Sequence, residues 1–111
     1  MLEVRRIAHV AMAGRAPFSG PISVNINASY AIPASWSKRK RAEFGFAFKT
    51  SRPDVDNLAK AIMDAIGDNL SLSQTDKLGA IVFGDDAAVC RLCVEKRYGF
   101  EASVSVGIFP L

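Results

Sequence analysis

The chain has 111 residues, half of them hydrophobic, and its formal net charge is +3. This length accommodates one hydrophobic core, so we expect a single domain over residues 1–111, and the hydrophobic content excludes a disordered chain. We see no secretory signal peptide and no apolar run long enough to cross a bilayer, which predicts a cytoplasmic protein without a membrane partner.

The first third of the chain predicts one helix and one strand. Apolar residues recur at roughly helical spacing over residues 2–11, and Gly14 is a natural stop. Over residues 22–32 apolar side chains alternate with Ser, Asn and Ala, which is typical of a half-buried strand, and Pro33 ends it.

A basic segment follows. Ser35 is placed to cap a short helix through Arg41, and the alternating phenylalanines after it suit an extension of the sheet. Between Trp36 and Arg52 the chain carries six basic residues against only Glu43. They are Lys38, Arg39, Lys40, Arg41, Lys49 and Arg52. Such a cluster favours a phosphate-rich partner, although a solvated surface produces the same pattern.

Two carboxylates stand one residue apart where the next helix is expected to begin. Asp54 follows a proline and is a natural N-cap, and Asp56 lies in the first turn. The helix is predicted by an apolar stripe and ended by Gly67; the stripe comprises Leu58, Ala59, Ile62 and Ile66. Lys60 lies four residues after Asp56, on the same face. The alternative is that Asp54 is only a cap and that Asp56 and Lys60 form a surface ion pair.

A second acidic pair, Asp85 and Asp86, stands just before a strand predicted over residues 87–97. Crowded carboxylates repel unless a cation relieves them, and Mg²⁺ prefers such oxygen ligands together with substrate phosphates. These acids therefore predict metal-assisted attack on a phosphodiester, whereas the simpler reading of the second pair is a turn. A last strand begins near Ala102, and we expect it to form an antiparallel hairpin with the strand before it.

Cys90 and Cys93 have the spacing of a redox or zinc motif. On a strand, however, residues three apart face opposite sides, and the chain has no second cysteine pair to complete a tetrahedral zinc site. We expect two ordinary reduced thiols.

At these residues the chain resembles the RusA family of Holliday-junction resolvases, which are common in bacteria and their phages. The matching stretches are residues 52–60, 64–66, 84–89 and 94–99, and the basic segment at 32–41 is similar to that of many phage members. Together they cover most of the chain, and the core Asp-x-Asp-Asn-Leu-x-Lys is fairly specific.

The resemblance implies a homodimeric endonuclease that needs Mg²⁺, with Mn²⁺ as a substitute, and no organic cofactor. Such enzymes cut two opposed strands of a four-way DNA junction symmetrically. Asp54 and Asp56 match the family's paired metal-binding aspartates, Asp86 matches its third essential carboxylate, and Lys60 matches its catalytic lysine. The polar stretch at 68–80 is longer than usual, which makes Asp85 the alternative to Asp86. The six basic residues are expected to bind the DNA backbone without reading bases.

The expected fold is α/β (α+β), a small mixed sheet with helices packed on one face, as in RusA. Family members usually begin with a further strand and a basic, proline-containing loop, and this chain starts at what corresponds to the helix after them. The second hypothesis is therefore a truncated, catalytically inactive DNA-binding remnant. A third is a structural domain in which the acidic residues are caps and turns.

Overall fold

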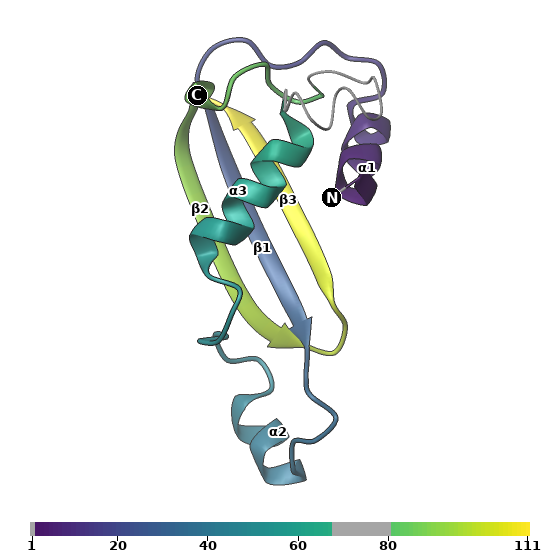
Figure 1. Cartoon of the computed structure of the whole chain (residues 1–111), viewed down its shortest axis with the longest axis vertical. Coiled ribbons are helices and arrows are strands. Elements are labelled where there is room, and N and C mark those ends of the chain that lie inside the picture. Colours follow the sequence, from purple (N-terminus) through teal and green to yellow (C-terminus); the bar gives the residue numbers. More distant parts are fainter. Residues whose placement is uncertain (1, 68–80) are drawn as a thin grey trace.

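A computed structural model describes residues 2–67 and 81–111 (Figure 1). The elements are α1 (Leu2–Met12), β1 (Ile22–Ala31), α2 (Lys38–Phe44), α3 (Val55–Ile66), the short 3₁₀ helix η1 (Asp86–Ala88), β2 (Val89–Gly99) and β3 (Ser103–Pro110). The polar stretch predicted at 68–80 lies outside the described residues. No helix within the described ranges is both long and apolar enough to cross a membrane.

The three strands form one mixed sheet in the order β2-β1-β3, with β1 parallel to β2 and antiparallel to β3. The predicted hairpin between the last two strands is wrong, because β2 and β3 lie on opposite sides of β1 and are joined past its end (Figure 1). The central strand β1 is the most buried of the three and carries the fully buried Ile22, Val24 and Ile26, whereas the edge strands β2 and β3 are more exposed.

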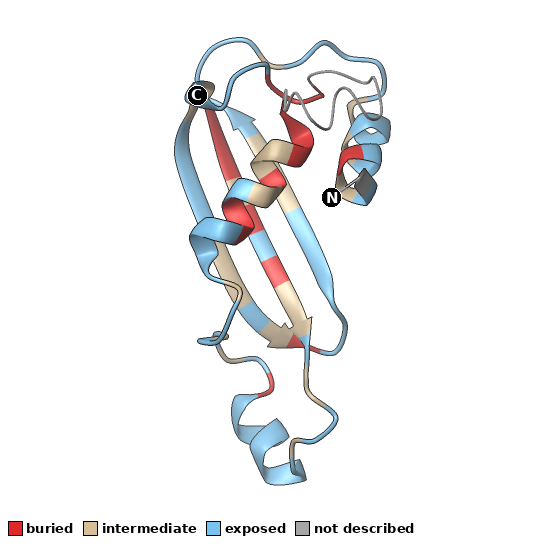
Figure 2. Ribbon diagram, viewed as in Figure 1, coloured by how far each residue is buried: buried red, intermediate tan, exposed pale blue. Residues whose placement is uncertain are grey.

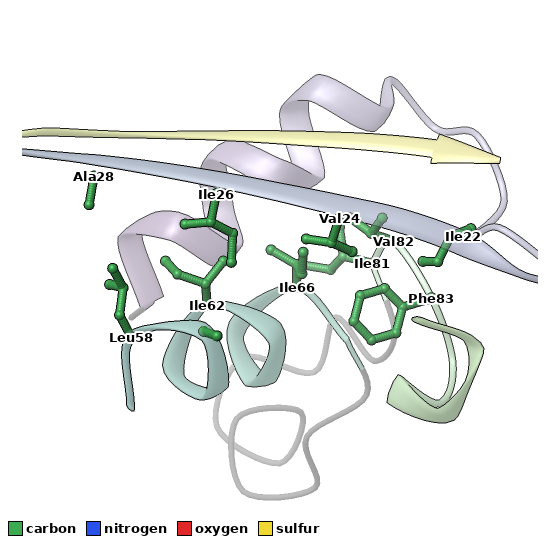
Figure 3. Close-up of a cluster of buried hydrophobic side chains, with 11 residues drawn as sticks. Ile22, Val24, Ile26, Ala28, Leu58, Ile62, Ile66, Ile81, Val82 and Phe83 are labelled. Carbon is green, nitrogen blue, oxygen red and sulfur yellow. The ribbon is translucent and has the colours of Figure 1, made fainter. Parts of the chain in front are cut away.

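The core lies between one face of the sheet and α3, as Figures 2 and 3 show. Alternate residues of β1 point to α3, and the predicted apolar stripe of α3 meets them, which confirms both patterns. The buried set is Ile22, Val24, Ile26, Ala28, Leu58, Ala59, Ile62 and Ile66, joined by Ile81, Val82 and Phe83. With α1 and α3 both packed on this face, the expected α+β architecture is confirmed.

The N-terminal helix is confirmed, and Val4 and Ala8 of the expected apolar stripe pack against the core, but other members of the stripe do not. Ile7 and Val10 are exposed, whereas Arg5 is fully buried, with 0% of its surface accessible. The Arg5 Nη1 donates to the carbonyl oxygens of Ala65 (3.0 Å) and Gly67 (2.9 Å) at the end of α3. The Arg5 guanidinium thus donates to carbonyl groups that have no hydrogen-bond partner inside α3, and its positive charge lies at the negative end of the α3 dipole.

The predicted bounds of the basic helix are wrong. It spans Lys38–Phe44, and its cap is Ser37, whose Oγ accepts from the Lys40 backbone N–H at 3.2 Å. The helix starts late because the chain first makes a turn after Pro33, closed by the bond from Trp36 N–H to the Pro33 carbonyl at 3.1 Å. After the helix, the phenylalanine-rich segment forms a single bridge to β2 rather than a further strand.

Candidate functional site

The first acidic pair lies at the entrance of α3. Asp54 occupies the N-cap position with an extended backbone, and its side chain makes no capping hydrogen bond. Asp56 follows in the first turn, and both residues are exposed. The simple reading of Asp54 as a side-chain cap is therefore not supported, and both carboxylates face solvent beside the positive end of the helix dipole.

Lys96 fixes the segment that leads into this pair, and sequence reasoning missed it. Its Nζ donates to the carbonyl oxygens of Ser51 (2.8 Å) and Pro53 (2.6 Å), so it ties the residue just before Asp54 to β2. Lys96 is in register with the buried Ala28 of β1. Lys96 could have been identified from the sequence, because it occupies a position of β2 whose side chain is expected to face the core.

Lys60 is exposed, and the ion pair that it forms is with Asp64, at 3.8 Å from Nζ to Oδ2. Its ammonium group is therefore directed toward the next turn of α3. A pair this exposed contributes little to stability. The Lys60 amine lies on the same helix as Asp54 and Asp56 and is exposed, so a ligand can reach it.

The second acidic pair lies at the other end of α3. The Asp85 carboxylate accepts from the Ala87 backbone N–H at 2.9 Å and caps η1, and Asp86 begins η1. Both line a cavity of about 240 Å³ together with Asp64, Gly67 and other residues from the end of α3. The predicted turn at this pair is thus present, and Asp85 has a structural role in it.

The structure does not bring the two acidic pairs together. α3 has 12 residues, which corresponds to about 18 Å of helix between Asp54 and the end of the helix near Asp86. Because α3 and β2 run in opposite directions, the residue that precedes β2 lies beside the end of α3 (Figure 1). Within residues 2–67 and 81–111, no three His, Cys, Asp or Glu side chains are grouped closely enough to hold a metal. In this conformation the expected set of Asp54, Asp56 and Asp86 does not converge on one ion.

The entrance of α3 nevertheless has the donor chemistry that Mg²⁺ accepts. Mg²⁺ is commonly held by one or two carboxylates, with water and substrate phosphates completing its shell. Asp54 and Asp56 supply two exposed carboxylates. They fit this mode of binding better than the other pair, in which Asp85 is already engaged as a cap.

The basic segment, residues 38–52, comprises α2 and most of the chain that connects α2 to the entrance of α3 (Figure 1). Three of its six cations also make internal contacts. Arg41 donates to the carbonyl oxygens of residues 33, 34 and 36, Lys40 lies 4.5 Å from the Trp36 ring centre, and Lys49 lies between the rings of Tyr30 and Tyr98. Lys38, Arg39 and Arg52 are exposed. Of these three, Arg52 stands two residues before Asp54, whereas Lys38 and Arg39 lie on α2, beyond the end of the sheet (Figure 1). Positive charge in the chain that leads to two exposed carboxylates suits a site for a metal and a phosphate.

Cys90 and Cys93 are both free and exposed, so the expectation of unpaired thiols is confirmed.

The family Endodeoxyribonuclease RusA matches residues 2–109. A protein of Bacillus subtilis (strain 168), called Uncharacterized protein YqaN, is 33% identical over 94 residues, which are 81% of this chain and 58% of that protein. The chain therefore spans little more than half the length of this relative. No solved structure matches the chain.

Proposed function

Because the chain belongs to the RusA family of endodeoxyribonucleases, we propose that it is a metal-dependent endonuclease that resolves four-way DNA junctions. The observation that supports this function most directly is the entrance of α3. There, Asp54 and Asp56 present two exposed carboxylates, and the chain that leads to them carries six cations. A basic surface for the phosphate backbone next to a carboxylate pair for Mg²⁺ suits hydrolysis of a phosphodiester.

In this proposal Asp54 and Asp56 hold Mg²⁺. When bound, the ion polarises the scissile phosphate and makes a water molecule more acidic. Lys96 keeps the segment before Asp54 on the sheet. Lys60 offers positive charge to the phosphoryl oxygens, where negative charge develops during attack.

The cations of the basic segment bind the DNA backbone, which predicts a steep loss of DNA affinity as the salt concentration rises. Two copies related by a two-fold axis would match the symmetry of the junction, and we propose a homodimer on this ground.

The test is cleavage of a labelled four-way junction by the purified chain in Mg²⁺, with a linear duplex of the same sequence beside it. We expect paired cuts in the junction. We expect Asp54→Asn and Asp56→Asn to reduce the cleavage rate by about 100-fold or more, because loss of a residue that only supports a metal ligand already costs about 10- to 100-fold. Glu3→Gln, an exposed acid on α1, is the matched control and should cut normally. Cleavage that survives in Asp56→Asn would remove Asp56 from the metal site.

Asp86 has an experiment of its own, because the resemblance and the structure disagree about it. If Asp86→Asn abolishes cleavage, the residue must reach the ion through a rearrangement or from a second chain. If Asp86→Asn cuts normally, the ion belongs to Asp54 and Asp56 alone. Stabilisation of each variant by Mn²⁺, measured as a shift in melting temperature, reports metal binding without relying on activity.

A second candidate function is junction binding without cleavage. It is favoured by one observation, namely that the described residues hold no three-carboxylate group suited to a metal. It predicts salt-sensitive binding of the junction in the absence of cutting, with Mg²⁺ or Mn²⁺ present. Paired cuts by the wild type that are lost in Asp56→Asn would exclude it.

A further inference from the structure

Three exposed phenylalanine rings lie near the end of β2. Phe46, Phe48 and Phe100 are 60%, 57% and 82% exposed. The rings of Phe46 and Phe100 pack edge to face with their centres 5.1 Å apart, and the guanidinium of Arg97 lies 3.9 Å from the centre of the Phe48 ring. We call these three rings and Arg97 the aromatic patch. Contiguous apolar surface of this kind on a small soluble domain usually marks a binding site.

Phe48 and Arg97 of the aromatic patch are held by the sheet, whereas Phe46 lies in the turn after α2 and Phe100 in the bend after β2. Phe48 and Arg97 form an antiparallel bridge. Backbone bonds on either side fix it: Lys49 N–H donates to the Lys96 carbonyl at 2.9 Å, and Tyr98 N–H donates to the Ala47 carbonyl at 3.1 Å. The segment that carries Phe48 is therefore fixed before binding, and Phe46 and Phe100 support each other through their ring contact, which lowers the cost of ordering the rings.

The aromatic patch continues onto the face of the sheet that points away from α3. Arg97 is in register with Ser29 of β1, and residues alternate between faces along a strand. Further along, Asn27 and Asn25 occupy the same face of β1, opposite Glu95 and Cys93 of β2. The described helices α1 and α3 pack on the other face. Among the described helices, α1 and α3 thus leave this polar face uncovered, with the aromatic rings at its end.

The charge around the rings selects the kind of partner. Residues 38–52 carry six cations and one anion, and α2 lies beyond the end at which β2 finishes (Figure 1). Glu95 forms an ion pair with Arg97 at 3.4 Å, and Glu101 directly follows Phe100, so the positive charge on this side comes chiefly from exposed cations of α2 such as Lys38 and Arg39. Aromatic rings beside a cationic track are the combination that binds single-stranded nucleic acid, because every base has a flat face to stack.

We propose that Phe46, Phe48 and Phe100 form a stacking platform for unpaired bases of a DNA strand whose phosphates contact the neighbouring cations. This inference rests on the proposed function, since it takes DNA as the ligand, and it adds a preference for exposed bases such as those opened at a branch point. A second copy of the chain is the competing occupant of the rings.

The experiment measures binding of a labelled oligo-dT strand to the whole chain by fluorescence anisotropy, in EDTA so that cleavage plays no part. An abasic strand of the same length carries the same phosphates without bases. Stacking of one base on an aromatic ring corresponds to about 5- to 150-fold in affinity. We expect Phe48→Ala and the double variant Phe46→Ala/Phe100→Ala to lose oligo-dT affinity within this range and to bind the abasic strand as the wild type does.

Three controls complete the design. Phe109→Ala removes a ring of similar exposure, 53%, from the other end of the sheet and should bind normally. Phe48→Trp keeps a stacking ring and should retain affinity. Arg39→Ala removes an exposed cation and should weaken both strands equally while lowering the salt dependence.

The inference is overturned if the phenylalanine variants bind oligo-dT like the wild type, or if they lose the same factor on the abasic strand. It is also overturned if they change the sedimentation of the protein while leaving DNA binding intact, because the rings would then join two copies. Failure of the wild type to bind any DNA would instead refute the proposed function. Junction cleavage together with unaffected phenylalanine variants would refute the stacking platform alone.

Discussion

Replacing Arg5 by Met tests whether a buried guanidinium joins α1 to the core. Methionine keeps an apolar stem in the buried space but removes the donors to the Ala65 and Gly67 carbonyls. A hydrogen bond from a charged group contributes about 1.5–3 kcal/mol, so the two bonds together predict a loss of at least about 3 kcal/mol. This is a large part of the 5–15 kcal/mol or so that stabilises a typical domain.

The assay is urea unfolding followed by circular dichroism. With an m value of about 1–3 kcal/mol/M, the midpoint should fall by about 1–3 M. Arg6→Met is the matched control, because Arg6 is the next residue of the same helix, its side chain is 71% exposed, and its ion pair with Glu3 (2.5 Å) lies in solvent. Such a pair contributes at most about 1 kcal/mol. Equal midpoints for the two variants would refute the assignment of Arg5 as the anchor of α1.

Three further predictions concern other parts of the fold. Lys96→Met should lower the free energy of unfolding by about 2 kcal/mol, because the Ser51 and Pro53 carbonyls lose a charged donor. Lys96→Arg should recover part of this loss in the same urea assay, and an unchanged midpoint for Lys96→Met would show that these two bonds do not stabilise the fold. Gly67→Ala should cost about 1–3 kcal/mol, since a Cβ at this position would lie 2.8 Å from the Phe83 ring, and a melting temperature equal to the wild type's would show that the ring moves freely. Replacing Cys90 and Cys93 together by Ser should change stability by less than about 0.5 kcal/mol, because both thiols are free and exposed; a larger loss in thermal unfolding would assign them a role.

The elements with strong periodic patterns could be predicted from the sequence. β1 and α3 each present one apolar face, and each buries that face as expected. The position of Asp54 at the helix start was also predictable, because a proline, a capping residue and an apolar stripe agree there. These patterns lie within short stretches of the chain, so the sequence of each stretch is enough to predict the element that it forms.

Features that depend on distant contacts could not be predicted in this way. Periodicity identifies β2 and β3 as strands but contains nothing about which strand separates them, so the hairpin prediction failed. Arg5 looks like a solvated cation until the end of α3 is placed against it. The separation of Asp86 from Asp54 likewise follows from the opposite directions of α3 and β2, which no spacing in the sequence records.

The central place of β1 has a consequence for how this protein comes into being. Ile22 pairs with Val89 on one side and with Pro110 on the other, so both neighbours of β1 are made long after it. Contacts between residues so distant along the chain slow folding, because long loops must close before any pairing is gained. During synthesis, β1 therefore leaves the ribosome with both of its edges unpaired, and the sheet can be completed only when the last residues of β3 have emerged.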